Sequence, residues 1–127
     1  MPFYIIRDII IFMDTEVILL EGVQTFLDTL PKKQEAKAYW TMALLQKKGA
    51  TLRQPYCKPV KGYAELYELR VKFASDIVRL FYFEYNRKTY VITSGYVKKQ
   101  QKLNKQEIKR ANRLMLQYIE EHSDDQT

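Results

Sequence analysis

The sequence has one histidine and one cysteine among its 127 residues, and these scarcities exclude several kinds of site. The histidine, His122, opens an acidic C-terminal tail, 122–127, that we expect to be disordered. A Ser-His-Asp triad, a histidine-pair nuclease and a zinc site of His and Cys ligands therefore cannot be assembled from this chain. Cys57 alone cannot form an internal disulfide, which favours a cytoplasmic protein. Any catalysis at neutral pH must come from Lys, Arg, Tyr, Glu or Asp, or from a partner.

Glycine, proline and long apolar runs are also scarce. Four Gly and four Pro predict dense secondary structure with short loops. The longest unbroken apolar run, Ile9–Met13, is far shorter than the roughly 20 residues that span a bilayer. Arg7 and Asp8 interrupt the apolar N-terminal stretch, so it does not resemble a secretory signal. We expect a single domain over residues 1–121 with no membrane partner.

Positive charge is concentrated in the C-terminal half of the chain. Residues 58–113 carry fourteen basic and five acidic side chains, residues 1–57 are nearly balanced, and residues 114–127 carry four acidic and no basic ones. A basic surface of this kind is typical of proteins that bind a polyanion, although Lys-rich helices are also common on other proteins. The charge pattern favours a surface that faces nucleic acid or the ribosome.

The order of the periodic segments predicts an α+β fold, in which an N-terminal strand and a helical hairpin pack on a small antiparallel sheet with a C-terminal helix. A strand over 3–13 would join that sheet at an edge or beside a later strand, and Asp14 or Thr15 would cap the following helix. Helices are expected over 16–30 and 33–48, a loop over 52–63, strands over 65–73, 77–85 and 89–96, and a last helix from Asn104. The spacing of Asn104 to Glu107 resembles a capping box, with Asn in place of Ser or Thr as the N-cap.

The same periodicity predicts which helix residues face the core. The expected inward residues are Leu19, Leu20, Val23, Phe26, Leu27 and Leu30 in the first helix, Ala36, Trp40, Ala43 and Leu44 in the second, and Ile108, Ala111, Met115, Tyr118 and Ile119 in the last.

Charged residues alternate with apolar ones along the segment 65–73. Glu68, Arg70 and Lys72 would share the face opposite the core, each about 7 Å from the next. A solvated face with cross-strand ion pairs explains this pattern as well as a functional site does. Arg79 stands in an otherwise apolar strand, where a guanidinium is costly unless paired or solvated. It either pairs with a carboxylate such as Glu68 or opens onto an anion-binding site.

The last predicted strand runs into a basic turn. Gly95 would allow close approach of the backbone, and Tyr96 could stack on a base or move a proton. Three lysines that could hold phosphates follow: Lys98, Lys99 and Lys102. A basic run alone is usually only solvated, but an aromatic residue at the strand end before it adds support for a nucleic-acid site.

These segments together resemble RelE/HigB-type toxins of bacterial type II toxin–antitoxin pairs, and most closely their phage-associated branch. The resemblance rests on the order and spacing of Leu66-Tyr67-Glu68-Leu69-Arg70, Val78-Arg79-Leu80-Phe81-Tyr82 and Gly95-Tyr96-Val97-Lys98-Lys99-Gln100, with Ile108 and Ala111 on a closing helix. The earlier Phe26-Leu27-Asp28-Thr29-Leu30-Pro31 fits the same pattern. The similarity runs from about residue 23 to residue 118.

The resemblance implies a small toxin that cleaves mRNA in the ribosomal A site. Its antitoxin would commonly carry a helix-turn-helix domain, and operator DNA would be bound only through that partner. Arg70 and Arg79 match strand arginines that stabilise the scissile phosphate, and Glu68 matches an acidic position of the branch. Tyr96, Lys98 and Lys99 match the catalytic strand end and turn. The chain departs from the pattern where Ser94 replaces a histidine and where Leu103-Asn104 replaces Thr-Pro.

A metal-independent ribonuclease needs a base near the ribose 2′-hydroxyl, cations for the phosphorane and an acid for the leaving 5′-oxygen. Glu68 or Tyr96 could be the base, Arg70 and Arg79 the clamp, and Lys98 or Lys99 the acid. We expect no cofactor or metal site, because the acidic residues of the basic half are scattered over several elements. Further RNA or ribosome contacts are expected from Lys58, Lys61, Lys72 and Lys102.

Two other functions fit the same pattern. A ParE-like, non-catalytic inhibitor of DNA gyrase would have nearly the same fold and charge, and a simple RNA-binding module is a third possibility. The role of the last helix, 104–121, is open as well. It is either permanently docked on the sheet or a mobile cover that an antitoxin displaces.

Overall fold

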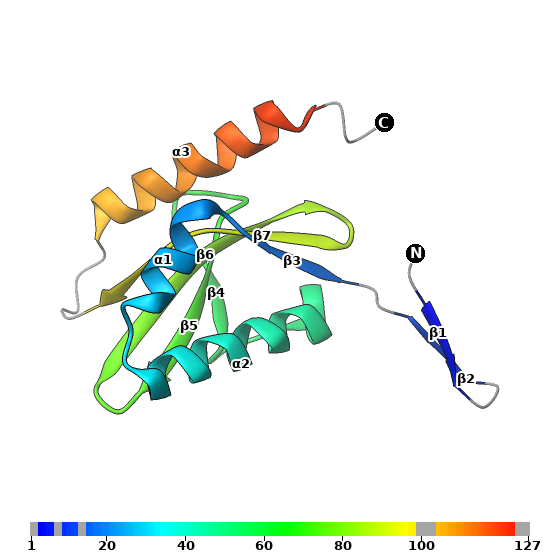
Figure 1. Ribbon diagram of the computed structural model, residues 1–127. Helices are drawn as coiled ribbons and strands as arrows, with labels where there is room; N and C mark the ends of the chain where they lie inside the picture. Colours follow the sequence, from blue (N-terminus) through cyan, green and yellow to red (C-terminus); the bar gives the residue numbers. More distant parts are fainter. Residues whose placement is uncertain (1–2, 7–8, 13–14, 99–103, 124–127) are drawn as a thin grey trace.

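The computed structural model describes residues 3–6, 9–12, 15–98 and 104–123. A mixed sheet carries helices on both faces, which confirms the α+β class (Figure 1). In chain order the elements are β1 (Phe3–Ile6), β2 (Ile9–Phe12), β3 (Glu16–Leu19), α1 (Glu21–Asp28), α2 (Lys32–Lys48), the short 3-10 helix η1 (Gly49–Thr51), β4 (Cys57–Pro59), β5 (Tyr67–Phe73), β6 (Asp76–Asn86), β7 (Thr89–Lys98) and α3 (Lys105–Glu121). No helix in the described part of the chain is both long and apolar enough to cross a membrane.

Five strands form the main sheet, in the order β3-β7-β6-β5-β4. The expected antiparallel meander is confirmed as β5, β6 and β7, because short turns join strands of β-branched and aromatic residues. The expected loop over 52–63 is wrong in part, since Cys57–Pro59 pairs with β5 as the edge strand β4. Three residues that end in a proline carry too little pattern to be recognised as a strand, and an edge is where proline is tolerated.

The N-terminal expectations are wrong in two respects. Strands β1 and β2 pair only with each other, and the edge of the main sheet is taken by β3, parallel to β7. Residues 16–19 are therefore a strand, and the first helix begins at Glu21 with Leu20 as an N-cap that has no side-chain hydrogen bond. The run Glu-Val-Ile-Leu is compatible with both a helical and an extended pattern, and pairing with β7 selects the extended form. Of the expected caps, Thr15 precedes a strand and Asp14 lies outside the described residues.

Helix α2 turns a different face to the sheet from the expected one. Its buried residues are Gln34, Ala38, Thr41, Met42 and Leu45. Trp40 is 49% exposed, with Lys37 above its ring and Tyr56 at its edge, and Ala36 and Ala43 are exposed too. Polar residues point inward because their hydrogen bonds are satisfied: the Gln34 amide donates to Asp76, and the Thr41 hydroxyl donates to a carbonyl one turn earlier.

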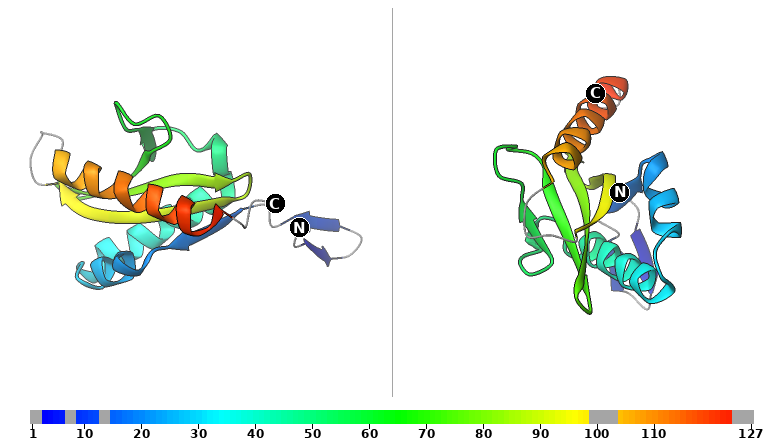
Figure 2. Two further views of the ribbon diagram at one scale, coloured as in Figure 1. Left: turned by 90° about the horizontal axis from the view of Figure 1, so that it is seen from above. Right: turned by 90° about the vertical axis from the view of Figure 1, so that its left-hand side faces the viewer.

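Each face of the sheet has its own apolar core, with α1 and α2 on one side and α3 on the other (Figure 2). The α2 face buries Val23, Leu27, Ala38, Met42, Leu45, Leu69, Val71, Val78, Leu80 and Ile92. On the α3 face, Phe81, Phe83 and Val91 meet three helix residues, Ile108, Ala111 and Met115. The expected core face of α3 is thus confirmed, and the helix is docked in this structure.

Candidate nucleic-acid site

Strand register gathers most of the predicted site residues on one face of the sheet. Residues directly opposite each other in neighbouring strands share a face. One cross-strand row is Lys58, Glu68, Phe81 and Ser94, the next is Arg70, Arg79 and Tyr96, and the last is Lys72, Ile77 and Lys98. We call the charged members of these rows, together with Tyr96, the cation face: Lys58, Glu68, Arg70, Lys72, Arg79, Tyr96 and Lys98. The face lies on the α3 side, at the end of the sheet where β7 ends and α3 begins (Figure 1).

A buried ion pair holds the centre of the cation face. The Arg79 guanidinium donates to the Glu68 carboxylate, and both side chains are almost completely buried. Sequence reasoning left two possibilities for Arg79, and pairing with Glu68 is now established. Arg70 lies directly opposite Arg79 across the strand pair and is half-buried. Like charges directly opposite each other destabilise a sheet, and Glu68 offsets only one of the two cations.

Unsatisfied polar atoms are concentrated around this pair. The described residues contain four buried side-chain nitrogen or oxygen atoms without a hydrogen-bond partner: Arg70 Nε, Arg79 Nε, Tyr96 Oη and Glu107 Oε2. Three of them belong to one cross-strand row, and Glu107 is close enough to Tyr96 to influence its ionisation. Buried polar groups are normally paired, so two guanidinium Nε atoms without an acceptor in one row are a feature that folding does not explain.

Tyr96 is held as a neutral hydrogen-bonding group. Its ring stacks on Phe81, with ring centroids 5.8 Å apart. Burial raises the pKa of the Tyr96 hydroxyl, Glu68 pushes the pKa in the same direction, and Arg79 opposes them. A phenol whose pKa is raised is a poor base at neutral pH, so the structure favours positioning over proton abstraction for this residue.

Lys98 has the opposite tendency. Burial and the neighbouring Arg79 lower the pKa of its ammonium group, Lys58 and Arg70 lower it further, and Glu68 acts against them. A lysine whose pKa falls toward neutrality becomes a better proton donor, because it releases its proton more readily. These four charged neighbours also show that Lys98 belongs to the same electrostatic site as the arginines.

The remaining predicted residues fall into three groups. Lys58 and Lys72 lie on the cation face, half-buried and exposed respectively. Lys61 is exposed on the loop after β4 and is not part of these rows. Lys99 and Lys102 lie outside the described residues. Among the residues that the structure does describe, no group of three or more His, Cys, Asp and Glu side chains gathers as metal ligands would.

Sequence reasoning missed Glu107, in the first turn of α3. The expected N-cap is confirmed, since the Asn104 side chain accepts from the Glu107 backbone N–H at 3.2 Å. In a complete capping box the carboxylate of the third helical residue bonds back to the cap. Glu107 instead leaves Oε2 without a hydrogen bond, and Arg110 lies 3.9 Å from that oxygen. An acidic residue at this spacing normally indicates only a helix start, which is why the site role was not evident.

Comparison with known proteins identifies the family. The family described as phage derived protein Gp49-like (DUF891) matches residues 25–116, which is more than half of the chain. The crystal structure of the archaeal RelE–RelB complex from Pyrococcus horikoshii OT3 is similar, with a TM-score of 0.48 and 18% sequence identity over 65% of this chain and 93% of that chain. None of the curated proteins matches the sequence. The chain therefore belongs to the Gp49-like family of phage-derived proteins.

Proposed function

We propose that this protein is the toxin of a bacterial type II toxin–antitoxin pair and cleaves ribosome-bound mRNA without a metal ion. The observation that carries the proposal is the row Arg70, Arg79 and Tyr96, with its unsatisfied Nε and hydroxyl groups. A phosphate bound at this row would accept hydrogen bonds from the guanidinium groups and would relieve the repulsion between the two arginines.

The cation face supports a division of labour in the transesterification. The ribose 2′-oxygen attacks phosphorus while Arg70 and Arg79 stabilise the charge that develops on the phosphorane. Lys98 protonates the leaving 5′-oxygen, which its lowered pKa favours. Glu68 orients Arg79. When the phosphate accepts a hydrogen bond from the Arg79 guanidinium, Glu68 is free to accept the 2′-hydroxyl proton. Tyr96 donates its hydrogen bond to a phosphate oxygen.

The ribosome would complete the site by positioning the RNA. Lysine, tyrosine and arginine have ordinary pKa values well above 7, so none is an efficient acid–base group unaided. Holding the 2′-oxygen in line with the scissile bond compensates for weak acid–base groups. We therefore expect cleavage to depend on the ribosome, with no cofactor.

An antitoxin would neutralise the protein by covering the cation face or occupying it with acidic side chains. We expect that antitoxin to carry a helix-turn-helix domain and to bring the pair to its operator DNA. The exposed cations Lys61 and Lys72 would form part of the contact.

Induction in a bacterial host separates this proposal from gyrase poisoning. Amino-acid incorporation should stop promptly while thymidine incorporation continues. Arg70→Ala should lower the cleavage rate by about 10²–10³, the usual cost of losing one group that stabilises the transition state. Lys47→Ala, at an exposed cation of α2, is the matched control and should remain toxic. Prompt loss of DNA synthesis with translation intact would support the ParE-like alternative instead, and a folded Arg70→Ala/Arg79→Ala variant with full toxicity would refute the site.

A further inference from the structure

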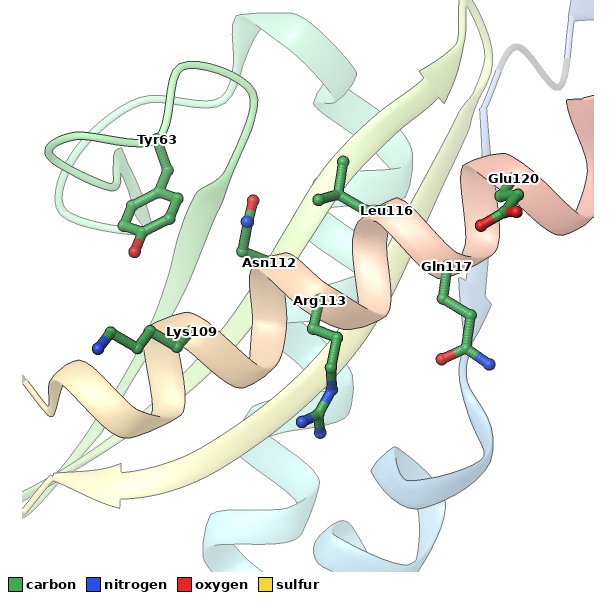
Figure 3. A pocket seen from close by; sticks show the side chains of 7 residues that line it. All are labelled: Tyr63, Lys109, Asn112, Arg113, Leu116, Gln117 and Glu120. Atoms are coloured by element: carbon green, nitrogen blue, oxygen red, sulfur yellow. The ribbon is translucent and has the colours of Figure 1, made fainter.

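An opening lies between α3 and the loop that joins β4 to β5, on the same side of the sheet as the cation face. It is an open pocket of about 440 Å³, lined by Tyr63, Lys109, Asn112, Arg113, Leu116, Gln117 and Glu120. In Figure 3 the Tyr63 ring projects from the loop toward α3, opposite Asn112 and Lys109. The helix residues form two adjacent rows at intervals of one turn.

The loop holds Tyr63 in a fixed position. Val60 and Leu66 are buried in the core under α3, and the Val60 backbone N–H donates to the Leu66 carbonyl at 2.9 Å. Inside this closed loop the Tyr63 N–H donates to Val60, and the Tyr63 carbonyl accepts from Leu66. Tyr63 is only half-buried, so an aromatic face is presented to the opening without the entropic cost of ordering a loop.

The charges in the last turn of α3 oppose its helix dipole. Helices are stabilised by acidic residues in the first turn and basic residues in the last. In α3 the first turn holds Glu107 as well as Lys105, whereas Glu120 and Glu121 end the helix and the last turn has no basic residue. Lys109 and Arg113 follow Lys105 along the half of the helix nearest the cation face, and both are exposed. Helix stability does not explain the acidic last turn. The exposed cations Lys105, Lys109 and Arg113 make the first half of α3 the half that would attract a polyanion.

We propose that this opening binds single-stranded RNA that continues from the cation face, with a base stacked on Tyr63 and phosphates held by Lys109 and Arg113. The inference rests on the proposed function and extends it to the path of the substrate. Lys58 connects the two places, because it precedes the loop in sequence and its charge acts on Lys98 in the site. Aromatic platforms beside a cationic track are the usual means of binding single strands without sequence preference.

Fluorescence anisotropy with 2′-O-methyl RNA tests the path without cleavage, because the methyl group blocks attack by the 2′-oxygen. Tyr63→Leu keeps apolar bulk against the core and should weaken binding of an oligonucleotide of about ten residues roughly tenfold. Lys109→Gln/Arg113→Gln should reduce the slope of log K against log salt by about 1.4, or ~0.7 for each phosphate that is no longer neutralised. A 2′-O-methyl trinucleotide, which reaches only the cation face, should bind these variants as it binds the wild type.

Lys33→Gln/Lys47→Gln removes the same charge from exposed positions of α2 and serves as the control. Equal weakening by this pair, or no weakening by Tyr63→Leu, would overturn the proposal. The proposal would also be overturned if Tyr63→Leu and Lys109→Gln/Arg113→Gln bound RNA normally but were no longer neutralised by the co-expressed antitoxin. That result would assign the opening to a protein partner. A wild-type protein that binds the methylated RNA but leaves ordinary ribosome-bound mRNA intact would instead contradict the proposed function.

Discussion

At the scale of single residues, the arginine pair opposite each other on β5 and β6 is the feature least explained by folding. A solvated sheet face would separate like charges, yet Arg70 and Arg79 share a cross-strand position and Glu68 pairs with only one of them. Burying this ion pair costs desolvation free energy, and breaking it costs more than replacing it. We therefore expect the Glu68–Arg79 ion pair to be kept for function, and removing Glu68 should show how much the ion pair contributes to stability.

Glu68→Ala should lower the free energy of unfolding by about 3–5 kcal/mol, because it leaves Arg79 buried without a counter-ion. Glu68→Gln keeps an acceptor for the guanidinium and should cost clearly less. Urea unfolding followed by circular dichroism measures both, with Glu65→Ala at an exposed position as the control. Equal losses of unfolding free energy in all three variants would contradict a stabilising role for the Glu68–Arg79 ion pair.

The pKa of Lys98 should respond in opposite directions to its two kinds of neighbour. Removing a cation by Arg70→Gln should raise the pKa, whereas removing the carboxylate by Glu68→Gln should lower it further. NMR titration of the Lys98 side chain gives both values in the free protein. Because the cation is the proton donor, cleavage should fall as pH rises through this pKa. Shifts of the same sign in both variants would contradict the electrostatic coupling of the cation face.

At the scale of elements, alternation was enough to predict the meander β5–β6–β7, and the capping pattern at Asn104 predicted the start of α3. The strand β3 was not predictable, because Glu16–Leu19 satisfies both periods and its partner β7 is about 70 residues away in the chain. The prediction of the inward face of α2 was also wrong, because hydrogen-bonded polar residues such as Gln34 are buried while Trp40 is exposed. The site residues on β5, β6 and β7 were named from sequence, and pairing with Glu68 was one of the two possibilities for Arg79. The structure established that pairing, and the place of Glu107 depended on helix docking.

Gly95 fixes how closely α1 approaches β7. A Cβ at this position would lie 2.6 Å from Leu80 Cδ2 and 2.8 Å from Phe26 Cε2. Gly95→Ala should therefore lower the free energy of unfolding by about 1–3 kcal/mol through overpacking. Gly22→Ala in α1 is the matched control, since its nearest neighbour is an Arg110 nitrogen at 3.5 Å and alanine favours a helix. Urea unfolding should show a lower free energy of unfolding for Gly95→Ala and a higher one for Gly22→Ala. Equal destabilisation by both would mean that the close packing at Gly95 is not specific.

At the scale of the whole molecule, the two faces of the sheet have separate tasks. The α2 face supplies a core of aliphatic side chains and aligns the strands, while the α3 face is apolar under the helix and cationic beyond its N-terminus. The register of β4 to β7 brings five of the fourteen basic residues of 58–113 to one end of one face of the sheet: Lys58, Arg70, Lys72, Arg79 and Lys98. Such a concentration attracts polyanions over long range and at low salt.

The chemistry of the RNA ends tests the central claim most directly. Purified protein is added to a translating ribosome system, and the new ends of the mRNA are analysed. Attack by the ribose 2′-oxygen leaves a 2′,3′-cyclic phosphate and a 5′-hydroxyl, with no cleavage when ribosomes are omitted and about 10²–10³ less with Arg70→Ala. We predict these ends. New 5′-phosphate ends would contradict the proposed chemistry, and intact mRNA in the complete system would contradict the assignment of this protein as a ribonuclease.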